Sequence, residues 1–269
     1  MTKSNNQPDW HAIAEKFDIW LPQLKPVGDA MLDILQVNHG DLVLDVASGT
    51  GEPALSLAKL QRDVVITGVD SAEGMINVAQ SKVEKQKLKN ISFQTMPVEH
   101  LAFDDNSFDK ILCRFGVMLF EDPQAGLNEM FRVLKPNGQF VLAVWGEAET
   151  MPSMYWSYQI FKDKVDEQAY PPLHKVTWLG EDGVFETLLN NAGFENITIE
   201  HKTFNYQFDS IDDYWDALES SDILKQQFEA MENSSKSEVR NELAEFAKEY
   251  VTAEGLRVPH DYLLVHGKK

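Results

Sequence analysis

The chain has 269 residues, 43% of them hydrophobic, and a formal net charge of −19 at pH 7. That much apolar sequence can fill the core of one large α/β domain, or of one domain with an insertion. The negative charge argues against nucleic acid as a partner, because nucleic-acid binding draws on clustered Lys and Arg. No uninterrupted apolar run reaches about 18 residues, so we expect no membrane span.

The single cysteine, Cys113, lies in an apolar run and has no partner for an internal disulfide. We therefore expect a buried thiol and a cytoplasmic location, since a reducing compartment keeps thiols free. The first residues lack the apolar core of a signal peptide and are predicted to form a polar tail.

The N-terminal segment is predicted to be helical. A helix is expected over residues 9–20, where apolar residues recur at helical spacing. Pro22 and Pro26 are predicted to interrupt this helix, and a second one is expected over residues 29–35. Because the segment precedes the first strand, we expect residues 1–40 to form a helical lid over the ligand crevice.

Strands and helices alternate over the next hundred residues or so. The predicted strands cover residues 42–46, 64–69, 91–95, 108–113 and 139–145. The predicted helices between them cover residues 52–59, 72–87 and 123–134. This alternation is typical of parallel βαβ units with right-handed crossovers. Residues 41–146 are therefore predicted to form one cofactor-binding α/β core.

After Trp145 the regular alternation ends. Residues 147–178 are rich in Trp, Tyr and Met, and residues 204–257 look helical and acidic, while strands are predicted over residues 196–203 and 261–266. We therefore predict a Rossmann-like, seven-stranded α/β sheet that is mostly parallel, with an antiparallel last strand and helices on both faces. Helical insertions follow strands five and six, so that residues 147–269 combine substrate-binding insertions with the strands that complete the sheet.

Residues 43–53 read Val-Leu-Asp-Val-Ala-Ser-Gly-Thr-Gly-Glu-Pro, which is a strand ending in a turn of small residues. Gly49 and Gly51 let a ligand approach the backbone where a Cβ atom would block it. An open α/β sheet binds its ligand at such a turn. Together with Ala54, the glycines also satisfy G-x-G-x-x-A, and Asp70 lies near the offset of a ribose-binding acid. The turn alone therefore leaves two ligands open, which are adenosylmethionine and a dinucleotide.

Four blocks of the chain, in order and at matching spacing, resemble the class I S-adenosylmethionine-dependent methyltransferases. They are Leu44–Gly51, Gly68–Met75, Leu101–Asp109 and Asp122–Gly138. The chain is most similar to the small-molecule branch that includes the ubiquinone and menaquinone biosynthesis methyltransferases. The resemblance implies S-adenosyl-L-methionine as the cofactor and in-line methyl transfer to oxygen, nitrogen or carbon of a small-molecule acceptor. It leaves the oligomeric state open, a homodimer included, and we expect no metal site.

The resemblance also implies which residues surround the cofactor. They are Asp45, Ala47, Gly49, Gly51, Asp70, Ser71, Met75, Val98, Glu99 and Arg114. Asp45 and the turn at 47–51 would hold the methionine end, and Asp70 would accept both ribose hydroxyls. Ser71, Met75 and residues 98–99 would border the adenine. Two positions depart from the family pattern, because Ala47 replaces a glycine and Pro97 replaces an acid that accepts from the adenine amino group.

Aromatic residues are the candidates for the acceptor pocket, where they would line an apolar wall or stack on a cation. They are Trp20, Phe115, Tyr155, Trp156, Tyr158 and Trp178. Methyl transfer depends chiefly on proximity and alignment, and it needs a base only where the acceptor loses a proton. His11, His100 and His174 are candidates for that base, but none lies in a catalytic signature, so no catalytic residue is assigned.

Two other functions are compatible with parts of the sequence. Tyr158 and Lys162 have the Y-x-x-x-K spacing of an NAD-dependent short-chain oxidoreductase, although the glycine turn begins only at residue 47. A non-catalytic adenosylmethionine-binding protein would keep the same cofactor residues. Binding of adenosylmethionine rather than NAD separates the first alternative from a methyltransferase, and formation of a methylated product separates the second.

Overall fold

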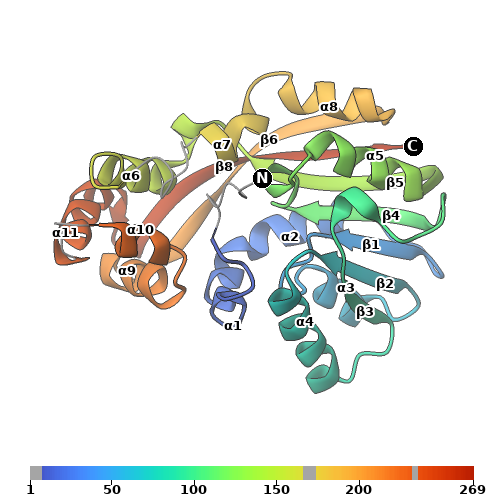
Figure 1. The fold of residues 1–269 in the computed structure, drawn as a ribbon, viewed down its shortest axis with the longest axis horizontal. Coiled ribbons are helices and arrows are strands. Elements are labelled where there is room, and N and C mark those ends of the chain that lie inside the picture. The colour runs from blue at the N-terminus through green and yellow to red at the C-terminus, as the bar shows by residue number, and fades with distance from the viewer. Residues whose placement is uncertain (1–7, 166–173, 232–235) are drawn as a thin grey trace.

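The protein is built on one mostly parallel sheet with helices around it (Figure 1). The computed structural model describes residues 8–165, 174–231 and 236–269. The strands in them are β1 (Leu42–Val46), β2 (Val65–Asp70), β3 (Ile91–Thr95), β4 (Phe108–Arg114), β5 (Leu134–Trp145), β6 (Glu195–Phe208), β7 (Val251–Thr252) and β8 (Gly255–Lys268). Neighbouring strands follow the order β3-β2-β1-β4-β5-β8-β6, and β7 pairs with β8. Strands β1 to β5 are parallel, and β8 is antiparallel to both β5 and β6.

The predicted fold class is confirmed, including the antiparallel last strand. The predicted strand count is wrong, because the described sheet has eight strands rather than seven. The additional strand is the two-residue β7, which forms a hairpin with β8 and lies in a segment predicted to be helical. The central strands are apolar on both faces: Val43, Leu44 and Val46 of β1 are all fully buried. Such burial is expected of a parallel strand covered by helices on both sides.

The described helices are α1 (Ala14–Phe17), α2 (Leu21–Leu35), α3 (Ala54–Leu60), α4 (Glu73–Gln86), α5 (Pro123–Val133), α6 (Pro152–Phe161), α7 (His174–Thr177), α8 (Val184–Ala192), α9 (Ile211–Ser220), α10 (Lys225–Ala230) and α11 (Lys236–Ala247). Helices α5 and α8 pack against each other along the upper edge of the view in Figure 1. The predicted polar tail at residues 1–7 and the part of the aromatic insertion at residues 166–173 lie outside the described residues.

The N-terminal helices differ from the prediction. Only residues 14–17 of the first expected helix are α-helical, and α2 runs unbroken through Pro26. Pro22 lies in the first turn of α2, where its missing N–H has no partner to lose. Pro26 gives up one helical hydrogen bond, but the buried face of α2 packs on β4, β5 and β6 and keeps the helix intact.

Strands β6 and β8 are much longer than predicted, and they carry a second group of helices. Twelve residue pairs join the two strands, from Glu195–Lys268 to Phe208–Leu256. Helices α6, α9, α10 and α11 gather around the ends of β6 and β8 that extend beyond the rest of the sheet (Figure 1). The helical segment predicted to begin at residue 204 therefore begins only after residue 208. A cavity lies between these helices and the glycine turn.

Candidate functional site

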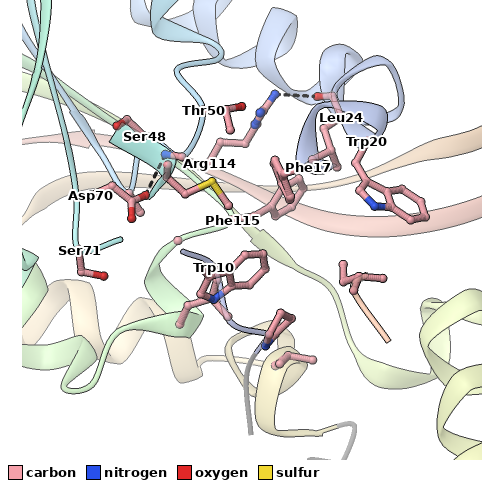
Figure 2. A pocket seen from close by; sticks show the side chains of 18 of the residues that line it. Trp10, Phe17, Trp20, Leu24, Ser48, Thr50, Asp70, Ser71, Arg114 and Phe115 are labelled. Atoms are coloured by element: carbon pink, nitrogen blue, oxygen red, sulfur yellow. Dashed lines mark hydrogen bonds between the residues drawn. The ribbon is translucent and has the colours of Figure 1, made fainter. Parts of the chain in front are cut away.

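A cavity of about 770 Å³ lies at the carboxyl ends of β1, β2 and β4, the position at which open α/β sheets bind ligands. We call one end of it the glycine-loop end, which is formed by residues 47–50, 69–71 and 96–100 with Glu52, Met75 and Arg114. We call the other the aromatic end, which is formed by Trp20, Trp145, Ser153, Tyr206, Tyr214 and neighbouring apolar residues. Figure 2 shows Asp70 and Ser71 on one side and Trp20 on the other, with Phe17 and Phe115 between them.

The two glycines of the turn have different physical roles. Gly49 has φ of 53° and lines the cavity, and a Cβ atom added there would meet no atom within 4 Å. Gly51 has φ of 104°, and its added Cβ would lie 2.7 Å from Leu55 and 3.0 Å from Phe93. Gly51 therefore lets α3 pack closely on the sheet and does not line the cavity, whereas Gly49 leaves open space beside the backbone.

Asp70 ends β2 with its carboxylate held at the cavity wall. One oxygen accepts a hydrogen bond from the N–H of Gly49 at 2.9 Å (Figure 2). The other accepts from the N–H of Ala72 at 2.9 Å. Burial raises the pKa of Asp70, and these two bonds oppose the rise. Each oxygen keeps a further lone pair, so the carboxylate can accept two more hydrogen bonds from a ligand.

Two buried charges lie beneath the turn. Asp45 is 1% exposed, and its Oδ2 atom has no hydrogen-bond partner among the described residues. Burial raises the pKa of Asp45 well above its usual range, although the positive charge of Arg114 acts against this. Arg114 ends β4 and donates from Nη1 to the carbonyl oxygen of Leu24 at 3.2 Å (Figure 2). A buried carboxyl oxygen without a partner is free to accept a hydrogen bond from a ligand.

The wall opposite the glycine turn comes from residues 96–99 and from α4. Val98 lies in a short turn there, and Glu99 accepts hydrogen bonds from the N–H groups of Glu121, at 2.9 Å, and Asp122, at 3.3 Å. Met75 of α4 is 3% exposed and packs against the N-terminal segment while also lining the cavity. The structure thus brings eight of the ten predicted cofactor residues to one end of the cavity, with Asp45 buried beneath it and Gly51 in a packing position.

The segment around α1 closes one side of the cavity through polar contacts to both ends. The N–H of Gly74 on α4 donates to Nδ1 of His11 at 2.9 Å, and Lys82 pairs with Asp18 at 2.7 Å. Lys16 forms an ion pair with Asp222, which follows α9 on the far side. Because the contacts reach α4 on one side and the helices of the aromatic end on the other, this segment bridges the cavity.

The predicted aromatic residues divide into two groups. Trp20 and Phe115 line the cavity, whereas Tyr155, Trp156 and Tyr158 of α6 do not. Tyr155 is 44% exposed, and Trp156 is buried against Tyr214 and Tyr250. The prediction misplaced these three because the serines of α6, rather than its aromatic residues, face the cavity. The aromatic content of the helix does not show which of its faces points inward. Trp178, the remaining candidate for the acceptor pocket, lies outside the cavity wall as well.

Several aromatic residues of the cavity wall were not predicted as site residues, and three of them, Trp145, Tyr206 and Tyr214, lie at the aromatic end. Trp145 at the end of β5 stacks on Phe115, with ring centroids 3.6 Å apart and planes at 15°. Tyr206 and Tyr214 contact Trp20 at centroid distances of 5.7 Å and 6.4 Å. A weak signal was present, since Trp145 ends a strand whose carboxyl end faces the ligand side. Nothing local in the sequence marks the two tyrosines.

Charge is distributed unevenly along the cavity. The charged residues of its wall, among those described, are Glu52, Asp70, Glu99, Arg114 and Glu121. All five belong to the glycine-loop end or border it, and four of them are acids. The aromatic end is lined by Trp, Tyr, Ser, Gln, Met and aliphatic side chains. The site therefore offers an acidic compartment next to an uncharged aromatic one.

The residues of the oxidoreductase alternative lie elsewhere. Tyr158 is not part of the cavity wall, and Lys162 donates to Gln159 at 2.6 Å. His100 lines the cavity, and the side chain of His174 lies outside the described residues. No cluster of three metal-ligating side chains is present in the described part of the chain. Among the described helices, none is long and apolar enough to cross a membrane.

Comparison with known proteins agrees with this geometry. Residues 38–193, more than half of the chain, match the methyltransferase domain family. The demethylmenaquinone methyltransferase of Bacteroides fragilis is 35% identical over 175 residues, which cover 60% of this chain and 71% of that protein.

Two solved structures share the fold. The YcgJ protein of Bacillus subtilis superposes with a TM-score of 0.61 at 20% identity, covering 91% of this chain and 98% of that one. Phosphoethanolamine N-methyltransferase 2 of Haemonchus contortus, solved with S-adenosyl-L-methionine, has a TM-score of 0.62 at 19% identity, covering 95% of this chain and 56% of that one. The chain therefore belongs to the methyltransferase domain family, as an S-adenosylmethionine-dependent enzyme that acts on a small molecule.

Proposed function

We propose that this enzyme methylates a small, neutral, aromatic acceptor that binds at the aromatic end of the cavity. The observation that carries the proposal is the division of one continuous cavity into an acidic end and an uncharged aromatic end. The acidic end suits a cationic methyl donor, and the aromatic end suits an acceptor without charge.

The residues of the glycine-loop end fit S-adenosylmethionine. The open space at Gly49 lets a ligand lie close to the protein backbone. The second lone pairs of the Asp70 oxygens can accept hydrogen bonds from both ribose hydroxyls. The orphan oxygen of Asp45 and the buried hydroxyl of Ser48, which also lacks a partner among the described residues, suit the methionine end. When bound, the cofactor supplies a methyl group made electrophilic by the sulfonium.

We assign the adenine to the wall formed by Met75, Ser71 and residues 97–99. Met75 offers an apolar face, and Ser71 is exposed to the cavity. Pro97 has no side-chain acceptor for the adenine amino group, and one Glu99 oxygen is already bonded to backbone N–H groups. The remaining oxygen of Glu99 and the backbone of Val98 are therefore the acceptors we propose for the adenine.

The acceptor is held, in this proposal, between the stacked pair Phe115–Trp145 and the cluster Trp20–Tyr206–Tyr214. These rings offer flat apolar surfaces, and no carboxylate of the described wall lies among them to neutralise an amine. The bacterial relative named for demethylmenaquinone supports an aromatic acceptor of the quinol type. We also propose residues 8–20 as the lid of the site, on the strength of their contacts to Gly74, Lys82 and Asp222.

Two arms of one assay test the acceptor. The full chain is incubated with methyl-labelled S-adenosylmethionine and either chemically reduced demethylmenaquinone with a short side chain or phosphoethanolamine. We expect label in the quinol and none in the amine. Label in phosphoethanolamine alone would overturn the neutral-acceptor proposal. Cofactor binding without transfer to any aromatic acceptor would favour the non-catalytic binding protein instead. A cytoplasmic location and a homodimer remain predictions, which fractionation and sedimentation of the native protein test.

A further inference from the structure

Three residues from distant parts of the chain lie together at the back of the aromatic end. Ser153 of α6, Tyr214 of α9 and His260 of β8 are 5%, 2% and 0% exposed. The hydroxyl of Ser153 lies 2.5 Å from Nε2 of His260, and the Tyr214 side chain lies beside Ser153. Ser153 and Tyr214 line the cavity, while His260 lies behind them.

The direction of each hydrogen bond follows from the histidine. Nδ1 of His260 lies 3.0 Å from the carbonyl oxygen of Val258, and a carbonyl can only accept, so Nδ1 carries a proton. A neutral imidazole then has a lone pair on Nε2, which makes Ser153 the donor to it. Since Ser153 has a single proton, its oxygen can only accept a hydrogen bond from the cavity side.

The surroundings of His260 keep it neutral. The rings of Tyr206, Phe204 and Trp145 lie 4.0, 5.8 and 6.4 Å from the imidazole between centroids. Burial lowers the pKa of His260 to about 4, and its hydrogen-bond partners are a hydroxyl and a carbonyl rather than a carboxylate. The tautomer and the order of the hydrogen bonds are therefore fixed at neutral pH.

Because the Ser153 proton points inward to His260, the cavity side of Ser153 offers oxygen lone pairs. A ligand group that donates a hydrogen bond is accepted there without any rearrangement. A ligand group that can only accept requires Ser153 to give up its bond to His260. A donor is also available nearby: Nε1 of Trp20 is buried without a partner in the described residues, and its ring contacts that of Tyr214. A hydroxyl group, which donates and accepts, satisfies both features.

We propose that Ser153, oriented by its hydrogen bond to His260 and lying beside Tyr214, is a recognition site for a hydroxyl group of the methyl acceptor, and that it selects this form over the corresponding ether or carbonyl. The identity of the ligand as methyl acceptor rests on the proposed function. The selection itself rests only on the geometry. For a quinol-type acceptor it means that the reduced form binds and the oxidised form is rejected, which matches the need for a nucleophile.

A matched pair of ligands tests the selection without turnover. Binding of 1-naphthol and of 1-methoxynaphthalene, which lacks only the hydroxyl proton, is measured by calorimetry on the full chain saturated with S-adenosylhomocysteine. We expect 1-naphthol to bind about tenfold more tightly, the size of one net hydrogen bond. Equal affinities would overturn the proposal. Because saturation with S-adenosylhomocysteine is measured first, a failure of the cofactor site is seen separately.

Four variants locate the effect. Ser153→Ala removes the accepting oxygen, and His260→Leu frees the Ser153 proton to point toward the cavity, so in both we expect the tenfold preference to fall to about twofold or less. His260→Gln keeps an acceptor oxygen near the Nε2 position and should retain the preference. Ser157→Ala is the matched control, because Ser157 lines the same wall but donates to the carbonyl of Ser153 at 3.0 Å. An unchanged preference in Ser153→Ala would refute the assignment.

Should His260→Leu fail to fold, the tautomer gives an independent readout. Nitrogen-15 spectra of labelled wild-type protein are expected to show a neutral His260 with its proton on Nδ1 and a hydrogen-bonded Nε2. On addition of 1-naphthol, the Nε2 resonance should shift in the wild type and remain in place in Ser153→Ala. A proton on Nε2 would contradict the order of hydrogen bonds on which the proposal depends.

Discussion

Replacing Asp70 by asparagine isolates the negative charge at the cofactor site. The carboxylate accepts one backbone N–H on each oxygen, from Gly49 and Ala72, and its remaining lone pairs are proposed to accept the ribose hydroxyls. The amide of asparagine has one oxygen and one NH2 group. One backbone N–H that donates to Asp70 would therefore face the NH2 group, which is also a donor. The change keeps the size of the side chain, and it therefore tests hydrogen bonding rather than packing.

The expected loss is that of a hydrogen bond to a charged group, about 1.5–3 kcal/mol, which weakens the Kd for S-adenosylmethionine roughly 10- to 100-fold. Titration calorimetry measures it directly. The matched control is Asp63→Asn, because the side chain of Asp63 is 75% exposed and pairs with His39 away from the cavity. An Asp70→Asn protein that folds and binds the cofactor with wild-type affinity would remove Asp70 from the site.

The same residue predicts a pH dependence. Burial raises the pKa of Asp70 in the free protein, and ribose hydroxyls donate only to the ionised form with full strength. Binding should therefore favour loss of the proton, and the affinity should fall as the pH is lowered through the raised pKa. The dependence should flatten in Asp70→Asn, and an equally steep one in that variant would assign the titration to another group.

Three further predictions concern the lid, the buried histidine and the buried acid. Gly74→Ala places a Cβ atom 2.4 Å from the carbonyl oxygen of His11 and should push the proposed lid away from α4. The cofactor should therefore dissociate faster in stopped-flow measurements. Ser81→Ala, at an exposed position of α4, is the control and should not change the rate. His260 has a folded-state pKa of about 4, below its unfolded value, so as the pH falls its imidazole is protonated in the unfolded state before it is protonated in the folded state. Acidification from about pH 6.5 to 4 should then lower the free energy of unfolding by up to about 3 kcal/mol more than in His260→Gln, as urea titrations would show. Asp45 has a raised pKa and an unpartnered oxygen, so binding of the cationic cofactor at mildly acidic pH should release protons. Calorimetry measures this release as a difference between the heats of binding in buffers of different ionisation enthalpy. Equal heats of binding in these buffers would contradict the prediction.

Much of the parallel core could be predicted because its signals are local. The strand at residues 42–46, the small-residue turn and the acid at the end of the second strand lie within thirty residues of one another. Parallel strands with short crossovers place their carboxyl ends together, so Gly49 and Asp70 had to meet, as the 2.9 Å bond between them shows. The acidic half of the cavity was therefore accessible from sequence patterns and from the resemblance that they carry.

The aromatic half depends on contacts that no local pattern records. Ser153, Tyr214 and His260 meet only because β6 and β8 pair over twelve positions and bring α6 and α9 against their outer ends. The orientation of α6 decided that its serines rather than Tyr155, Trp156 and Tyr158 face the cavity, and packing on the sheet carried α2 through Pro26. The sequence by itself thus determined the glycine-loop end, where we propose that the methyl donor binds. Only the tertiary structure decided which side chains form the aromatic end, because long-range strand register and helix packing, rather than local periodicity, bring them together.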